Sequence, residues 1–110
     1  MAESKQYITQ AQENGNVLIS EDVITTIVSH AISEVEGVAG PGKKGWSKAV
    51  KLNISQEDTL SMECSILVYY GQAVVQIAKA VQAAIISAID SMTGIKVTAV
   101  NINVSGIVRK

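Results

Sequence analysis

The residues that most often carry out catalysis are sparse in this chain. It contains one His and one Cys, His30 and Cys64. Nucleophilic catalysis by Ser or Cys needs an adjacent base, usually His. His30 falls on the polar side of a helical apolar repeat, whereas Cys64 alternates in phase with Met62 and Ile66 and points into a core. The sequence therefore predicts an exposed His and a buried Cys that cannot pair.

The neighbouring carboxylates have structural explanations. Glu21 and Asp22 follow a helix-capping Ser20, where the helix dipole favours acids. Glu57 and Asp58 fall in a turn between two strand patterns. One Cys and one His also exclude a disulfide framework and a Cys/His zinc site. We therefore predict no catalytic residues, no metal and no cofactor, and we expect a protein that is not an enzyme.

Glycine and lysine gather in the one loop that is rich in Gly and Pro, residues 39–46. We define the basic docking loop by the six residues Gly42, Lys43, Lys44, Gly45, Trp46 and Lys48. A KH domain holds a nucleic-acid backbone with such a GxxG loop, but there the loop joins two helices and here a strand follows. Three readings stay open: a solubilising loop, a dock for an acidic partner or anionic lipid surface, and a nucleic-acid-binding loop. Ten acids against nine bases argue against a nucleic-acid binder driven by bulk charge.

A second candidate surface lies on the later helical segment, residues 72–92. Its core stripe accounts for one side. The polar residues that argue against a membrane span are Gln76, Lys79, Gln82 and Asp90. Apolar residues also occur around Lys79 on the other side, where a monomer needs none. The residues predicted for self-association are Val75, Lys79, Ala83 and Ile86.

These candidates need a scaffold, and the length of 110 residues fits one domain. We expect a flexible polar tail over residues 1–15 and a single domain over 16–110. The apolar patterns predict strands at 17–19, 50–54, 60–69 and 100–104, with helices at 21–35 and 72–92. A change of phase predicts a bulge near Ala99.

The order of these elements is β-α-β-β-α-β. Alternating strands leave one sheet face wet, so both helices cover the other. The fold class is therefore α+β, a two-layer sandwich of ferredoxin-like topology with two helices on one face of a mainly antiparallel sheet. The polar first sixteen residues hold no apolar run of the secretory kind, and a lone Cys fits a reducing compartment, so we expect a cytoplasmic protein.

Several short runs also resemble a known family. They are GNVLISEDVI at 15–24, EVEGV at 34–38, Tyr70-Gly71, Val81-Gln82, MTGI at 92–95 and VNINV at 100–104. These runs are similar to the alkaline shock protein 23 family, also called the general stress protein 24 family, and the resemblance spans residues 15–108. The family consists of small cytoplasmic proteins of Gram-positive bacteria and has no established catalytic residues.

This resemblance implies a non-enzymatic interaction or scaffold protein of the cell-envelope stress response, linked to membrane lipid homeostasis. It implies a homo-oligomer that docks on a small membrane-anchoring protein or a fatty-acid-synthesis enzyme. Such a protein is expected in the cytoplasm, held peripherally at the membrane through its partner. The alternative that the residues leave open is a nucleic-acid-binding module that uses Gly42-Lys43-Lys44-Gly45.

Overall fold

Helix α1 (Glu21–Ser33) begins where the sequence places its cap. In the computed structural model, which describes residues 7–55, 57 and 59–109, the Ser20 hydroxyl accepts a hydrogen bond from the Val23 N–H at 3.4 Å. The helix ends at Ser33, two residues before the predicted end. The chain then turns through Gly37, which has a φ of +99° and lies so close to Ile77 that a Cβ would stand 2.7 Å from its Cδ1.

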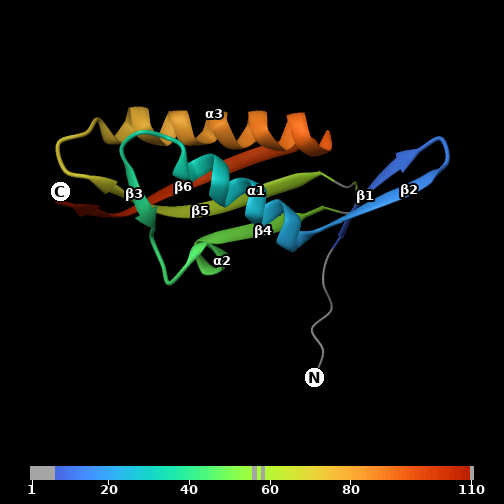
Figure 1. The fold of residues 1–110 in the computed structure, drawn as a ribbon, viewed down its shortest axis with the longest axis horizontal. Helices are drawn as coiled ribbons and strands as arrows, with labels where there is room; N and C mark the ends of the chain where they lie inside the picture. The colour runs from blue at the N-terminus through green and yellow to red at the C-terminus, as the bar shows by residue number, and fades with distance from the viewer. Residues whose placement is uncertain (1–6, 56, 58, 110) are drawn as a thin grey trace, which may run out of the picture.

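Strand β5 (Leu60–Tyr69) is the centre of the main sheet (Figure 1). Strand β6 (Val97–Val108) pairs in parallel along its whole length. Strands β3 (Val38–Pro41) and β4 (Val50–Ile54) pair antiparallel with different parts of β5, residues 66–68 and 60–64. Because a strand has only two edges and β6 occupies one of them, β3 and β4 share the other.

The β3 and β4 strands therefore form one interrupted row. Pro41 stands opposite Ile66, the Gly42 N–H donates to the Ser65 carbonyl at 2.8 Å, and Val50 stands opposite Cys64. Between Gly42 and Val50 the chain leaves the row, forms the four-residue helix α2 (Trp46–Ala49) and returns. The basic docking loop is thus an excursion from one edge of the sheet.

Helix α3 (Val74–Thr93) connects β5 to β6. It ends at Gly94, which has a left-handed φ of +73°. The predicted bulge near Ala99 is confirmed, since Leu60 pairs with Val97 but Ser61 pairs with Ala99. The extra residue is Thr98, whose hydroxyl donates to the Leu60 carbonyl at 3.2 Å.

The N-terminal region differs from the prediction. Residues 7–12, expected within a flexible tail, form β1 (Tyr7–Gln12), which pairs antiparallel with β2 (Gly15–Ser20). The strand expected at 17–19 is therefore part of a separate hairpin that projects from the main sheet (Figure 1). Ile8 is fully buried and belongs to the core cluster, so it holds the hairpin to the core. Residues 1–6 of the predicted tail lie outside the described residues.

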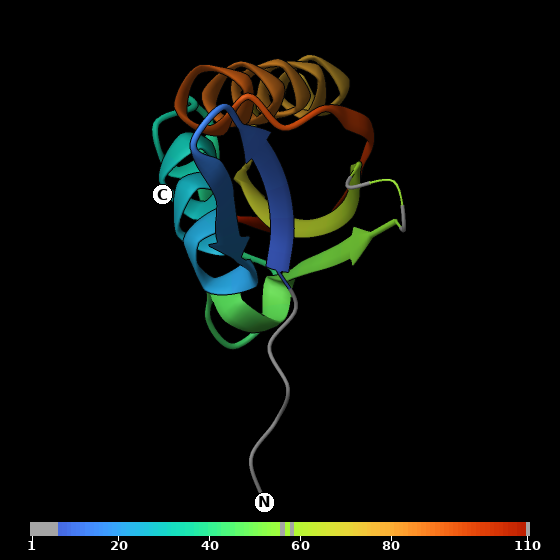
Figure 2. The same cartoon turned by 90° about the vertical axis from the view of Figure 1, so that its right-hand side faces the viewer.

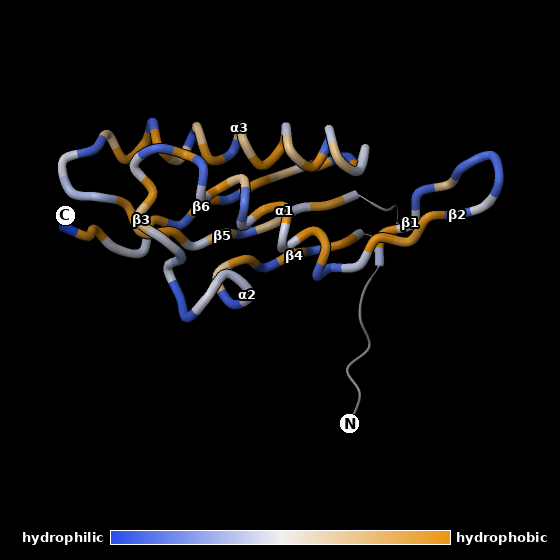
Figure 3. The backbone as a smooth tube through the Cα atoms, viewed as in Figure 1, coloured by the Kyte–Doolittle hydropathy of each residue, from blue (hydrophilic) through white to orange (hydrophobic). Residues whose placement is uncertain are grey.

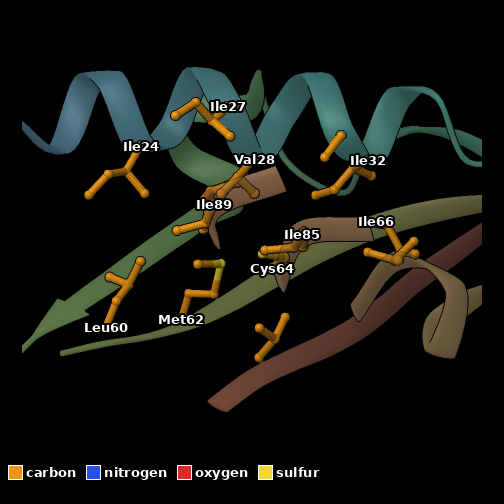
Figure 4. Packing of buried hydrophobic residues seen from close by; sticks show 14 of the residues in the cluster. Ile24, Ile27, Val28, Ile32, Leu60, Met62, Cys64, Ile66, Ile85 and Ile89 are labelled. Carbon is orange, nitrogen blue, oxygen red and sulfur yellow. The ribbon is translucent and has the colours of Figure 1, made fainter. Parts of the chain in front are cut away.

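The core lies between the main sheet and the two long helices. From the end of the molecule, α1 and α3 cover the same side of the curved sheet (Figure 2). Ile24, Val28 and Ile32 of α1 point onto β5 (Figure 4). A row of α3 residues joins them: Ile77, Val81, Ile85 and Ile89, all buried. The predicted α+β fold, with two helices on one face of the sheet, is confirmed. The sheet is mixed: β3 and β4 pair antiparallel with β5, but the long β5–β6 pairing is parallel.

Candidate functional site

His30 and Cys64 lie in different environments. The His30 side chain on α1 is 76% exposed, and its Nε2 lies 3.6 Å from Oε2 of the exposed Glu34. Cys64 on β5 is fully buried, and this burial, reinforced by the charge of Glu63, raises the pKa of its thiol to about 12. A thiol that stays protonated at neutral pH is a poor nucleophile. The prediction of an exposed His and a buried Cys is confirmed.

Acidic groups in the described part of the chain do not gather around these residues. Over residues 7–55, 57 and 59–109, no group of three or more His, Cys, Asp or Glu side chains could hold a metal ion. Glu21 and Asp22 stand in the first turn of α1, as predicted. Asp58 of the predicted turn lies outside the described residues.

The residues predicted for self-association all lie on the outer side of α3. Val75 is 67% exposed and Ile86 is 44% exposed, and Lys79 and Ala83 between them are exposed as well. We call the row Val75, Lys79, Gln82 and Ile86 the α3 flank. Spacings of four, three and four residues place its members on one side of the helix.

A hydrogen bond places the α3 flank against the sheet edge. The Gln82 Nε2 donates to the Val100 carbonyl oxygen at 2.9 Å. Val100 belongs to β6, so the α3 flank faces the β6 side of the molecule. The opposite side of α3 faces α1, since Ala84 and Ala88 line a groove that the two helices share.

Helix α3 is long and apolar enough to cross a membrane by length and composition. Ile77, Val81 and Ile85 are nevertheless buried against the sheet. The same helix therefore has a packed stripe and an exposed flank, as an amphipathic core helix does.

The basic docking loop brings its charges together on one exposed excursion. Lys43, Lys44 and Lys48 are exposed, while Trp46 is half-buried and packs against the core. Figure 3 shows a hydrophilic stretch of backbone in the excursion beside α2. Trp46 and the buried Ala49 anchor α2, so the lysines stand on a fixed base. The loop joins a strand to a four-residue helix, whereas a KH loop joins two helices.

A family model matches residues 9–109, which is almost all of the chain. The chain belongs to the alkaline shock protein 23 family. The description of this family is a cell envelope-related function. The matched range contains both the α3 flank and the basic docking loop, so the two surfaces are part of the family domain.

Two family relatives are similar along most of their length. YqhY of Bacillus subtilis strain 168 is 30% identical over 105 residues, covering 84% of this chain and 77% of the relative. Spy1535 of Streptococcus pyogenes serotype M6 is 28% identical over 103 residues, covering 86% and 80%. Both are described as uncharacterized proteins.

Solved structures of MamM CTD share the fold of this family member. One variant has a TM-score of 0.59 at 17% identity and covers 81% of this chain and 96% of its own. A nickel form has a TM-score of 0.58 at the same identity and covers 81% and 98%. This likeness supports the ferredoxin-like arrangement.

Two surfaces of this family member were not predicted from the sequence. The first is the groove of about 560 Å³ between α1 and α3, with His30 and Glu34 on one bank and Met92 on the other. It depends on how two helices meet, which the sequence does not reveal. The second is the outer edge of β6, whose twelve residues include no charge. The lack of charged residues in β6 could have been read from the sequence.

Proposed function

We propose that this member of the alkaline shock protein 23 family is a non-enzymatic interaction protein of the cell-envelope stress response. It acts as a scaffold that self-associates and docks on a partner. The observation that carries this proposal is the pair of exposed surfaces, one apolar and one basic, on a domain whose only His and Cys lie in separate environments. The envelope-related function of the family supports the same setting.

The α3 flank supports the self-association part of the proposal. Val75 and Ile86 keep 67% and 44% of their surface in water. Covering apolar surface stabilises a complex by about 25 cal/mol per Å². Since the core stripe already fills the inner side of α3, apolar residues at these positions favour a contact with another molecule.

Light scattering tests self-association. In Val75→Glu/Ile86→Glu, two charges enter the α3 flank, and we expect the molar mass to fall toward that of one chain. Met92→Glu is the matched control, because Met92 is 69% exposed on the same helix but faces the groove beside α1. An unchanged mass in the double variant would contradict a role for the α3 flank.

The basic docking loop supports the docking part of the proposal. Lys43, Lys44 and Lys48 present three cations on an excursion anchored by Trp46. Such a patch fits an acidic surface on a small membrane-anchoring protein or on a lipid-synthesis enzyme, and its binding weakens with salt. The protein is then cytoplasmic and peripheral at the membrane, and membrane lipid homeostasis is the process it serves.

A pull-down from the native host, with the membrane fraction kept, tests the docking role. We expect recovery of a small membrane protein or lipid-synthesis enzymes, and loss of that partner in Lys43→Glu/Lys44→Glu. Lys96→Glu serves as the control, since Lys96 is exposed just after the end of α3 and outside the loop. Recovery of ribonucleoprotein that disappears on nuclease treatment would overturn this proposal in favour of nucleic-acid binding through the loop.

A further inference from the structure

The outer edge of β6 is long and open. Its twelve residues pair with β5 on one side, and no other strand of the described residues pairs with them. None of the twelve is charged, and none is Pro. Natural sheets protect such edges with charges, Pro, bulges or covering segments, because a free row of N–H and C=O groups pairs readily with another strand. Strand β6 has bulges at Thr98 and Ser105, but residues 99–104 between them pair regularly with β5. This regular, uncharged stretch points to a partner strand.

The sequence of this edge is symmetric. Residues 100–104 read Val-Asn-Ile-Asn-Val in both directions. Pairing with β5 is regular along this stretch, because the register shifts lie on either side of it, at Thr98 and Ser105. Asn101 and Asn103 are exposed on the wet face, while Ile102 and Val104 are half-buried on the helix face.

The α3 flank continues this edge on the helix side. Gln82 spans the two elements through its hydrogen bond to the Val100 carbonyl oxygen. Val75 and Ile86 stand in the same row of α3. The open edge and the exposed apolar row therefore form one continuous surface.

We propose that a second copy of this chain pairs its β6 antiparallel with the β6 of the first, with Ile102 on the two-fold axis. This inference rests on the proposed function and specifies how its self-association occurs. Asn101 then stands opposite Asn103 of the second copy, and Val100 stands opposite Val104. Two three-row sheets become one continuous sheet, with the α3 helices of both copies on the same face and the two α3 flanks toward the junction.

The symmetry of residues 100–104 selects a second copy over a strand from another protein. A two-fold interface uses the same patch on both sides and must be complementary to itself. In the proposed register every pair joins like with like: valine to valine, isoleucine to isoleucine, asparagine to asparagine. Because side chains alternate between the two faces of a strand, pairing even-numbered residues with even and odd with odd keeps the same face of both strands toward the helices.

Charges on the wet face test the register. In Asn101→Lys/Asn103→Lys, each introduced lysine stands opposite an introduced lysine of the second copy, and like charges directly opposite are destabilising. We expect the dimer Kd, measured by light scattering over a concentration series, to rise about tenfold or more. Asn53→Lys is the control, since Asn53 is exposed on β4 at the other edge.

A charge reversal distinguishes this register from a general effect of charge. In Asn101→Lys/Asn103→Glu, the lysine at position 101 stands opposite the glutamate at position 103 of the second copy, at both ends of the pair. We expect the dimer Kd to return to the wild-type value or below it. A Kd that stays as high as in the double-lysine variant would overturn the register.

A disulfide provides a second measurement if the charged variants fold poorly. Ile102→Cys is made in a Cys64→Ala background, because Cys64 is the β5 neighbour of Ile102. Directly opposed residues in an antiparallel pair lie within the Cα distance that a disulfide spans. We expect mild oxidation to link two chains, and Ile107→Cys in the same background, 57% exposed near the end of β6, to link far fewer.

The outcomes separate this inference from the proposed function. In one outcome, Val75→Glu/Ile86→Glu dissociates the dimer, but the lysine variants at Asn101 and Asn103 leave its Kd unchanged and Ile102→Cys forms no cross-link. That outcome would overturn the β6 pairing and leave self-association through the α3 flank. A wild-type chain that is monomeric at high micromolar concentration would overturn both this inference and the self-association part of the proposed function. The docking role of the basic loop would stand in both cases.

Discussion

The two edges of the main sheet are built differently. The β3–β4 edge is interrupted by residues 43–49, carries Pro41, and presents Lys51 on its exposed face. The β6 edge runs for twelve residues without a charge or Pro, and Gln82 reaches over it at Val100.

The difference in strand length, Pro and charge indicates which of the two edges is protected from pairing with another chain. Short strands, Pro and Lys are the features that prevent one sheet edge from pairing with another chain. They occur together on the β3–β4 edge, which is therefore the outer boundary of the sheet and carries the basic docking loop. The β6 edge lacks them and is free to extend the sheet. Under the proposed function and the proposed pairing, one edge would present charge to a partner and the other would present its backbone to a second copy.

The largest effect is expected from removing a side chain on which both edges depend. Ile66 is fully buried on β5, opposite Pro41 on one side and Val104 on the other. Ile66→Ala leaves a cavity beneath both edges, and we expect the free energy of unfolding to fall by about 2–5 kcal/mol. Urea denaturation measures it, with Leu18→Ala, 58% exposed on the β1–β2 hairpin, as the control. A loss as small as that of the control would show that the edges do not share this core.

Gly42→Ala alters the row of β3 and β4 at the point where it lies closest to β5 and to Ser105 of β6. A Cβ at Gly42 would lie 2.6 Å from the Ser105 Oγ and 2.9 Å from the Ser65 Cβ, so the chain could not stay this close to β5. We expect a loss of stability of about 1–3 kcal/mol from this overpacking. Lys43→Ala, one residue along and exposed, should change stability by less than about 0.5 kcal/mol. Equal melting temperatures for the two variants would contradict the close approach at Gly42.

Alkaline pH probes the strand between the two edges. The folded pKa of Cys64, about 12, lies above its ordinary value of 9.0. Below pH 9 both states keep the proton; above it the unfolded chain loses the proton first, so the stability falls as pH rises from 9 toward 12. By roughly pH 10, the loss in the free energy of unfolding that is due to Cys64 is about 1 kcal/mol. Chemical denaturation across this range should show a shallower decline for Cys64→Ala, and parallel declines would refute the buried thiol.

The smallest effect is expected at the β6 edge within one chain. Gln82→Ala removes the hydrogen bond to the Val100 carbonyl oxygen, and we expect a loss of about 1 kcal/mol. Amide hydrogen exchange should increase along β6 more than along β4. Gln76→Ala, on an exposed part of α3, is the control. Unchanged protection of β6 in Gln82→Ala would show that this side chain does not stabilise the edge.

The sequence predicts the parts of this fold that follow from periodicity. The apolar repeat of α1 and the Ser20 cap, the alternation in β4 and β5, and the phase change at Thr98 are all local patterns, and the structure has each of them. The exposure of Val75 and Ile86 follows from the same helical spacing.

The remaining parts depend on contacts between distant residues. The run Val17-Leu18-Ile19 reads as a sheet strand, yet it pairs with Tyr7–Gln12, a polar segment with little strand pattern of its own. The merging of β3 and β4 into one row depends on Gly42 and Val50 meeting neighbouring residues of β5. Such pairings are set by tertiary packing, which local propensity does not encode.

The excursion at residues 43–49 separates the residues that maintain the fold from those that set the charge of the surface. The chain departs from the sheet after Gly42 and returns at Val50 without displacing the ladder on either side. The length and charge of this segment can therefore change while the core residues beneath it stay the same, provided that an apolar anchor such as Trp46 is kept. Under the proposed docking role, grafting the corresponding segment between homologues should exchange partner preference while preserving the fold.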